Sequence, residues 1–400
     1  MAKIVLGIGT SHTPLLSLPA ERWAEYAQGD QRNPELCYPP HGWAMPYQEG
    51  LEYVSPEIKA KFQDEGPFTE WAARCQRALD ELSDTLRAAK PDITVVISDD
   101  QDEWFFESNM PAMAVYWGES LKVEPRKPAW ATSDLAQLIA AGYGDTELDV
   151  PVPSAFGRFV VEYLTEHDFD IAQFNYLDEL HGGRVARRYP TRTGELDHVR
   201  ETEPRPQGLP HGFAFIVKRL FRNEPSPILP VFQNTCYPPN QPTPRRSFAL
   251  GQALAGAIAA WQEPARVAVV ASGGLSHFVV DEELDQMILG GLARRDADGL
   301  RSVPRCRLYS AASESLNWIA LGGALQDTEL EMELVDYVPV YRTPAGTGGG
   351  WAFARWCRGG EPSPRHLQGI SGALTLPSPA AAGEGLARMT GSLAFGSGDV

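Results

Sequence analysis

Short apolar runs alternate along this chain with longer segments in which apolar residues recur every three to four positions. Strand-like runs lie at residues 3–9, 93–97, 112–117, near 171, at 227–233, 266–272 and 331–341. Helical spacing predicts helices over 70–90, 154–166, 211–221, 245–261, 281–293 and 313–325. This alternation predicts an α/β fold, in which a central mostly parallel or mixed sheet carries helices on both faces.

Three stretches fall outside the alternation. Residues 16–67 hold many prolines and aromatic residues, and residues 180–208 are polar and rich in arginine. We interpret both as ordered insertions, because loops of this length are usually functional when they are not disordered. From residue 359 onward Gly, Ala, Ser and Pro dominate without periodicity. We therefore expect a single domain over 1–358 and a disordered tail over 359–400.

Composition narrows the classes of partner. The chain has 400 residues with a net charge of −17, which disfavours nucleic acid and anionic membrane surfaces. No run of about 18 apolar residues is present, and the apolar N-terminal run is too short for a signal peptide. The five cysteines are scattered without a CxxC pair, which argues against a disulfide framework or a zinc ribbon. We expect a cytoplasmic protein that spans no membrane.

Two histidines follow predicted strands. His12 stands in Gly-Thr-Ser-His-Thr-Pro after the strand at 3–9, and His277 in Ser-Gly-Gly-Leu-Ser-His after the strand at 266–272. Open α/β folds place their chemistry where strands give way to loops, and an imidazole there can bind a metal or exchange protons. The alternatives are purely structural: His12 is a hydrogen-bonded core histidine, and His277 ends a tight turn between strand and loop.

Other polar residues are candidates for functional roles, and each also has a purely structural explanation. Glu314 opens a predicted helix, where it either binds a metal or compensates the helix dipole. The acidic cluster 99–103 ends a buried strand and is either a metal site or a solvated loop. His211 opens a predicted helix, either as a functional group or as a capping residue. The pair Arg245-Arg246 opens another, where it either binds a carboxylate or is solvated.

Together these motifs resemble the class III (type II) extradiol ring-cleavage dioxygenases, which include the protocatechuate 4,5-dioxygenase β subunit and the gallate dioxygenases. The resemblance is nearest to the 3-O-methylgallate dioxygenase-like branch and runs from residue 3 to about residue 357. The matching pieces, in order, are Gly-Thr-Ser-His-Thr-Pro around His12, Asp100-Gln101, Asn109-Met110-Pro111, His211-Gly212, Tyr237-Pro238-Pro239, Ser-Gly-Gly-Leu-Ser-His ending at His277, Ser313-Glu314 and Gly323-Ala324-Leu325.

The resemblance implies a mononuclear Fe(II) held by two histidines and one carboxylate. His12 matches the first iron histidine and Glu314 the carboxylate. His277 matches the catalytic acid and base, and His211 matches a second catalytic histidine near the oxygen site. The resemblance further suggests Arg246 and Tyr237 as substrate-binding residues.

One position departs from the best-known members of that family. Gln101 stands where their second iron histidine falls, and it can offer only a carbonyl oxygen as a ligand. Asp102 or Glu103 can take its place after a shift of one or two residues, and His41 can reach in from the insertion at 16–67. The third metal ligand is therefore open at this point.

The implied activity is cleavage, with O2, of a catechol-type aromatic acid of the gallate, 3-O-methylgallate or protocatechuate class. By family analogy we also expect a homodimer. Gln101 keeps open an alternative, in which a diverged member with an altered or lost metal site acts as another enzyme on aromatic compounds or as a binding protein for them. A non-catalytic partner subunit is a further alternative, disfavoured by His12, His277 and Glu314 on separate segments.

Overall fold

The computed structural model describes residues 1–62, 67–125, 132–178, 180–206 and 208–359. Apart from Gly359, the expected disordered tail lies outside these residues. Among the described residues, no helix has the length and apolar character needed to cross a membrane.

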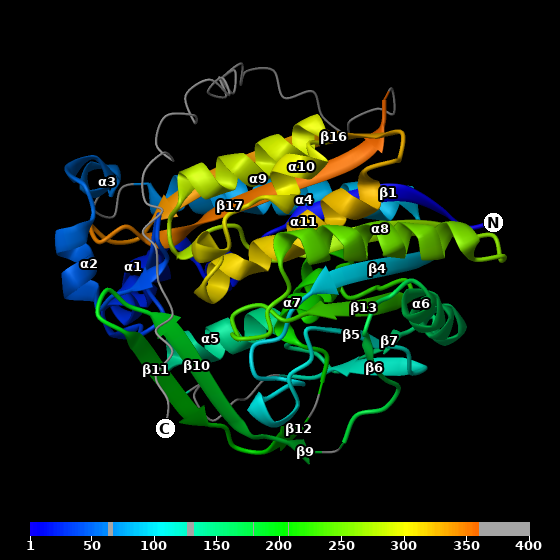
Figure 1. The fold of residues 1–400 in the computed structure, drawn as a ribbon, viewed down its shortest axis with the longest axis horizontal. Helices are drawn as coiled ribbons and strands as arrows, with labels where there is room; N and C mark the ends of the chain where they lie inside the picture. The colour runs from blue at the N-terminus through cyan, green and yellow to red at the C-terminus, as the bar shows by residue number, and fades with distance from the viewer. Residues whose placement is uncertain (63–66, 126–131, 179, 207, 360–400) are drawn as a thin grey trace, which may run out of the picture. The chain divides into compact units, whose positions relative to one another are not determined.

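A mixed sheet forms the centre of the fold (Figure 1). Within the described residues it has nine strands in the order β15-β17-β1-β14-β4-β13-β5-β8, with β16 paired to β17. Four neighbouring strands are parallel, namely β1 (Lys3–Thr10), β14 (Arg266–Ser272), β4 (Ile93–Ser98) and β13 (Ile228–Gln233). Antiparallel strands flank this parallel centre on both sides, so the expected mixed α/β sheet is confirmed.

The flanking strands extend the sheet from β1 and from β13. Beyond β1 lie β17 (Thr347–Arg358), β16 (Leu330–Tyr341) and β15 (His277–Val279). Beyond β13 lie β5 (Met113–Tyr116) and β8 (Ala172–Phe174). The strand β17 was not expected from the sequence, because three glycines, which are depleted in strands, follow its first residue.

Helices cover both faces, as the sequence predicts. One face packs against α6 (Ser154–Glu166), α8 (Pro244–Ala260), α9 (Glu282–Arg294) and α11 (Ser315–Leu325). The other face packs against α4 (Phe68–Ala89) and α7 (His211–Phe215), which continues into the π-helical turn Ile216–Leu220.

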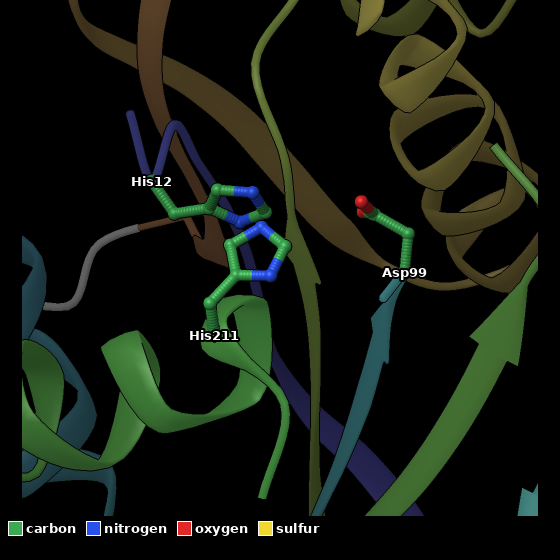
Figure 2. A group of neighbouring side chains, drawn as sticks. All are labelled: His12, Asp99 and His211. Atoms are coloured by element: carbon green, nitrogen blue, oxygen red, sulfur yellow. The ribbon is translucent and has the colours of Figure 1, made fainter. Parts of the chain in front are cut away.

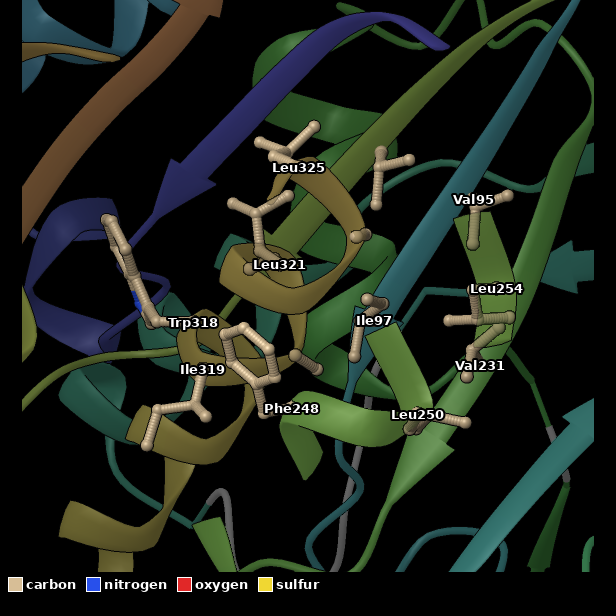
Figure 3. Packing of buried hydrophobic residues seen from close by; sticks show 14 of the residues in the cluster. Val95, Ile97, Val231, Phe248, Leu250, Leu254, Trp318, Ile319, Leu321 and Leu325 are labelled. Atoms are coloured by element: carbon tan, nitrogen blue, oxygen red, sulfur yellow. The ribbon is translucent and has the colours of Figure 1, made fainter. Parts of the chain in front are cut away.

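Strand alternation explains why both faces are apolar. In β4, Val95 and Ile97 pack under α8 and α11, as Figure 3 shows, while Val96 packs on the α4 side. All three side chains are fully buried, and each such burial contributes roughly 1.5–3 kcal/mol. A strand buried on both faces appears in the sequence as an unbroken apolar run, which is why these central strands were predictable.

The two predicted insertions hold short elements. Residues 16–67 contain α1 (Trp23–Ala27), α2 (Tyr47–Tyr53), α3 (Pro56–Lys61) and the pair β2 (Cys37–Tyr38) and β3 (Trp43–Ala44). Residues 180–208 contain the hairpin β10 (Arg184–Pro190) and β11 (Glu195–Glu201), and the pair β9 (Leu180–His181) and β12 (Arg205–Pro206). Three further elements were also unexpected: α5 (Asp134–Tyr143) and the paired strands β6 (Ser120–Val123) and β7 (Leu148–Pro151). The short helix α10 (Ala297–Arg301) follows α9.

Candidate metal and active site

The carboxyl ends of three parallel strands meet at one edge of the sheet. Thr10 of β1 lies beside Ser272 of β14, and Ala271 lies beside Ile97 of β4. His12 and Asp99 follow β1 and β4 directly, so they project beside Ser272. This edge is where open α/β sheets place their ligands.

The hydrogen bonds of His12 fix which ring nitrogen carries the proton. The Ser272 hydroxyl donates to the carbonyl oxygen of Gly212 at 2.7 Å, so it accepts a hydrogen bond from His12 Nδ1 at 2.9 Å. In the neutral ring, Nε2 therefore carries a lone pair. Nε2 is buried, has no hydrogen-bond partner in the part of the chain that the structure describes, and lies 3.5 Å from Oε2 of Glu314.

Glu314 lies at the end of the turn Ser310–Glu314 that leads into α11, and its carboxylate is buried. Its Oε2 accepts the backbone N–H of Gly274 at 2.7 Å. Burial by itself raises the pKa of this carboxyl, but the attraction of His277 and His12 outweighs burial and holds the pKa well below its ordinary value. Glu314 is thus a negative charge between two imidazoles.

His277 faces Glu314 from the opposite side of the carboxylate to His12. It opens the short strand β15 at the sheet edge, whereas the sequence placed it in the loop after β14. Its Nδ1 donates to the carbonyl oxygen of Leu275 at 2.9 Å, which directs Nε2 to Oε1 of Glu314 at 3.1 Å. Burial lowers the pKa of His277, but Glu314 outweighs burial, so the pKa is raised above its ordinary value. His277 can therefore hold and release a proton at Nε2.

His211 begins α7 and is oriented by Glu103. One carboxylate accepts both the backbone N–H of His211, at 3.0 Å, and its Nδ1, at 2.7 Å. The ring lies edge-on to that of His12, with centroids 4.8 Å apart. Because Nδ1 donates to Glu103, Nε2 of His211 also carries a lone pair in the neutral ring.

Asp99 is a site residue that sequence reasoning left undistinguished within the cluster 99–103. It is fully buried, Asn317 Nδ2 donates to its Oδ1 at 3.0 Å, and its Oδ2 has no hydrogen-bond partner among the described residues. Figure 2 shows the carboxylate turned toward the rings of His12 and His211. One ligand atom from each of the three residues lies within 4.8 Å of the others. Burial and the repulsion of Glu314 raise the pKa of Asp99 to about 6.

The other acidic residues of the cluster have different partners. Asp100 accepts three backbone N–H groups of residues 103–105, although burial and Glu103 raise its pKa to about 7. Asp102 forms ion pairs with Arg187 and Arg200. Asp102 is therefore turned to the arginines of β10 and β11, and the structure does not bring it to His12.

Gln101 lies at the site, but its amide nitrogen faces Glu314. Nε2 donates to Oε1 of Glu314 at 3.0 Å, and the same nitrogen lies 3.9 Å from Sγ of Cys236. The other suggested substitute, His41, stacks on Trp43 with centroids 4.4 Å apart and does not line the cavity.

A cavity of about 780 Å³ opens onto these groups. This volume falls in the range of small-molecule sites. His12, Gln101, His211, His277 and Glu314 line one side of it. The hairpin β10–β11 lines another side with three basic residues, Arg187, His198 and Arg200.

The two residues suggested for substrate binding lie elsewhere. Arg246 donates to the carbonyl oxygen of Asp168 at 2.9 Å and lies over the ring of Phe169. Tyr237 is buried behind Arg187, whose guanidinium carbon lies 4.5 Å from its ring centroid. Neither lines the cavity. The reason is local: Arg246 is in the first turn of α8, and this turn packs on the α6 side of the sheet.

The donor atoms at this edge fit a divalent cation. His12 Nε2 and Asp99 Oδ2 are buried polar atoms that accept no hydrogen bond from any described residue, and Glu314 adds a second carboxylate 3.5 Å from His12 Nε2. Each imidazole is held by a hydrogen bond through its other nitrogen, as is usual for metal-binding histidines. Mixed imidazole and carboxylate donors suit iron and similar metals.

Two comparisons with known proteins agree with this arrangement. Residues 64–346 match the family model of the catalytic LigB subunit of aromatic ring-opening dioxygenase. The chain is also 25% identical, over 253 residues, to a 2,3-dihydroxyphenylpropionate/2,3-dihydroxicinnamic acid 1,2-dioxygenase of Cupriavidus pinatubonensis (strain JMP 134 / LMG 1197). That match covers 62% of this chain and 64% of the relative. His277 and Glu314 fall inside the region matched by the family model, and this region is most of the chain: the protein belongs to the LigB family of aromatic ring-opening dioxygenases.

Proposed function

We propose that this protein is an Fe(II)-dependent extradiol dioxygenase of the 3-O-methylgallate dioxygenase-like branch. Its substrate is a catechol-type aromatic acid of the gallate, 3-O-methylgallate or protocatechuate class, cleaved with O2. The observation that carries the proposal is the convergence of His12, His277 and Glu314, from three separate segments, on one cavity. In this proposal residues 1–358 are the catalytic domain of a cytoplasmic homodimer.

His12 and Glu314 hold the metal in this proposal. Nε2 of His12 is already directed by Ser272, and Oε2 of Glu314 is steadied by Gly274, so neither donor has to reorient. When bound, ferrous iron supplies the Lewis acidity and the electron transfer to O2 that ring cleavage requires. Gln101 stands at the position that the resemblance gives to the third donor.

His277 is the acid and base of the proposal. Its Nε2 takes the proton of a substrate hydroxyl and later returns it, while the carbonyl of Leu275 keeps Nδ1 protonated throughout. Glu314 stabilises the protonated ring from 3.1 Å. His211, oriented by Glu103, lies beside His12 and takes the role of the second catalytic histidine, which would contact O2.

The carboxylate of the substrate is bound by the hairpin in place of Arg246. Along β11, His198 and Arg200 point to the same side, and Arg187 lies opposite His198 on β10. Arg200 has the more exposed side chain of the two arginines, at 45% against 6% for Arg187. Arg200 is thus the cation best able to bind an incoming carboxylate.

One observation favours the alternative of a diverged member. The side chain at position 101 presents an amide nitrogen to Glu314, and a nitrogen that donates there is not a metal ligand. In that alternative the cavity binds an aromatic compound without cleaving it. Iron content after anaerobic purification separates the two functions, because only the dioxygenase retains about one iron per chain.

Oxygen uptake tests the proposed function. Anaerobically iron-loaded protein is given gallate, 3-O-methylgallate or protocatechuate, and bound iron is measured in the same sample. The proposal predicts uptake with at least one of them and a ring-opened product. Absence of both iron and uptake supports the diverged alternative.

A further inference from the structure

Position 101 leaves the metal site one donor short. Imidazole at this position would bind a metal through a lone pair, but Gln101 uses its amide nitrogen to donate to Glu314. The amide oxygen is a weaker donor than imidazole. Some other group near His12 has to complete a three-donor site, and the described residues include one with an unused donor atom.

Asp99 has that unused atom. Its Oδ1 is anchored by Asn317, whose amide nitrogen also donates to the backbone carbonyl of Ser272, while Oδ2 is buried and has no hydrogen-bond partner within the described ranges. One oxygen of Asp99 lies within 4.8 Å of a nitrogen of His12 and of a nitrogen of His211. His12 shows the same combination: its Nδ1 is held by Ser272, and its Nε2 has no hydrogen-bond partner among the described residues.

The charges at the site favour the same position for a cation. Asp99 and Glu314 are both buried, with exposed fractions of 0% and 2%, and each places a carboxylate oxygen close to the imidazole of His12. Two buried carboxylates are costly unless a cation lies between or beside them. Figure 2 shows the Asp99 carboxylate turned toward the two imidazoles.

We infer that Asp99, rather than Gln101, is the third metal donor of this protein, acting with His12 and Glu314. One nitrogen of His211 lies within 4.8 Å of the same atoms of His12 and Asp99. Gln101 is then a positioning residue, which holds Oε1 of Glu314. The inference deepens the proposed function, since it concerns the metal which that function requires.

The test is Co(II) binding to the full-length protein, followed by calorimetry and by the visible spectrum of the bound ion. Asp99→Asn keeps the oxygen that accepts from Asn317, so the fold is preserved while the donor charge is lost. We expect its Co(II) affinity to fall at least about 100-fold, with a changed spectrum. Gln101→Ala, the matched variant, removes the donor to Glu314 and a weak contact with Cys236, and its affinity should fall about tenfold or less.

The reverse order, in which Gln101→Ala loses more affinity than Asp99→Asn, overturns the inference. If Asp99→Asn does not fold, anomalous diffraction from crystals of the wild-type protein with Co(II) decides instead. Asp99 Oδ2 bonded to cobalt supports the inference, and Gln101 bonded with Asp99 apart contradicts it. Neither measurement uses substrate or O2, so a failure of ring cleavage with intact Co(II) binding refutes the proposed function alone.

Discussion

The two walls of the cavity are built on opposite principles. The wall at the strand ends carries His12 and Glu314, with Asp99 close to His12 but outside the lining of the cavity. One atom of each of these side chains is held by a hydrogen bond, while His12 Nε2 and Asp99 Oδ2 have no hydrogen-bond partner among the described residues. The hairpin wall carries Arg187 and Arg200, whose charges are already matched by acidic partners such as Asp102. The first arrangement suits the binding of a cation. In the second, the carboxylate of a substrate can replace the acidic partner of an arginine. In the proposed function, metal chemistry therefore belongs to the sheet and substrate recognition to the insertion.

The largest effect is expected at the strand-end wall. His12→Ala removes the donor common to every metal set at this site, so bound iron should fall below detection and activity with it. The measurement is iron per chain after anaerobic reconstitution. His41→Ala is the matched control, because His41 stacks on Trp43 away from the cavity, and it should retain iron. If His12→Ala still bound about one iron per chain, the metal site could not lie at this wall.

The next effect separates holding the metal from moving a proton. His277→Phe keeps a ring of similar size but removes the Nε2 that faces Glu314, so iron should stay near one per chain. Turnover should fall by roughly 10²–10⁴-fold, the usual contribution of a general acid and base. Single-turnover oxygen consumption at saturating substrate measures it. Unchanged turnover would eliminate His277 from proton transfer.

A smaller effect is expected at the hairpin wall. Arg200→Gln removes the more exposed arginine, so the KM for the aromatic acid should rise about tenfold with little change in kcat. A catechol without a carboxylate should show no change. Arg188→Gln is the control, because Arg188 pairs with Asp197 on the other side of the hairpin. If both variants changed KM equally, or if Arg200→Gln changed KM equally for both substrates, the hairpin would not bind the substrate carboxylate.

The smallest effect concerns the support of the strand-end wall. Asp285 accepts the backbone N–H and the hydroxyl of Ser276, next to His277, and burial raises its pKa to about 7. The folded protein then binds one proton more than the unfolded chain between about pH 4 and pH 7, so this group makes stability fall as pH rises through that range. The Asp285→Asn variant has no ionisable group at this position, so it lacks this fall in stability. Its thermal midpoint relative to wild type should rise from pH 4.5 to pH 7.5, and a constant difference would contradict the assignment.

The strand-end wall was largely predictable from the sequence, and the reason is the sheet. Central strands buried on both faces leave unbroken apolar runs, so the positions of His12 and Asp99 at strand ends follow from the chain itself. His277 and Glu314 were singled out by motif. The choice of Asp99 among five adjacent polar residues was not predictable, because it depends on which oxygen lacks a partner after folding.

The hairpin wall was not predictable. Arg187 and Arg200 lie in a polar stretch whose only pattern is an excess of arginine, and their side of the hairpin is defined by the pairing of β10 with β11. Arg246, which the sequence suggested, is as basic as they are but lies on α8, away from the cavity. Composition identifies charge, whereas only the fold shows which charges line the cavity.

The most direct test of the central claim is oxygen uptake by iron-loaded protein with gallate, 3-O-methylgallate and protocatechuate, with iron measured in the same sample. The account predicts about one iron per chain and stoichiometric uptake of O2 with at least one of the three acids, giving a ring-opened product. One iron per chain without uptake of O2 in any of the three would contradict the proposed substrate class. The absence of both bound iron and O2 uptake would contradict the assignment of the strand-end wall to metal chemistry.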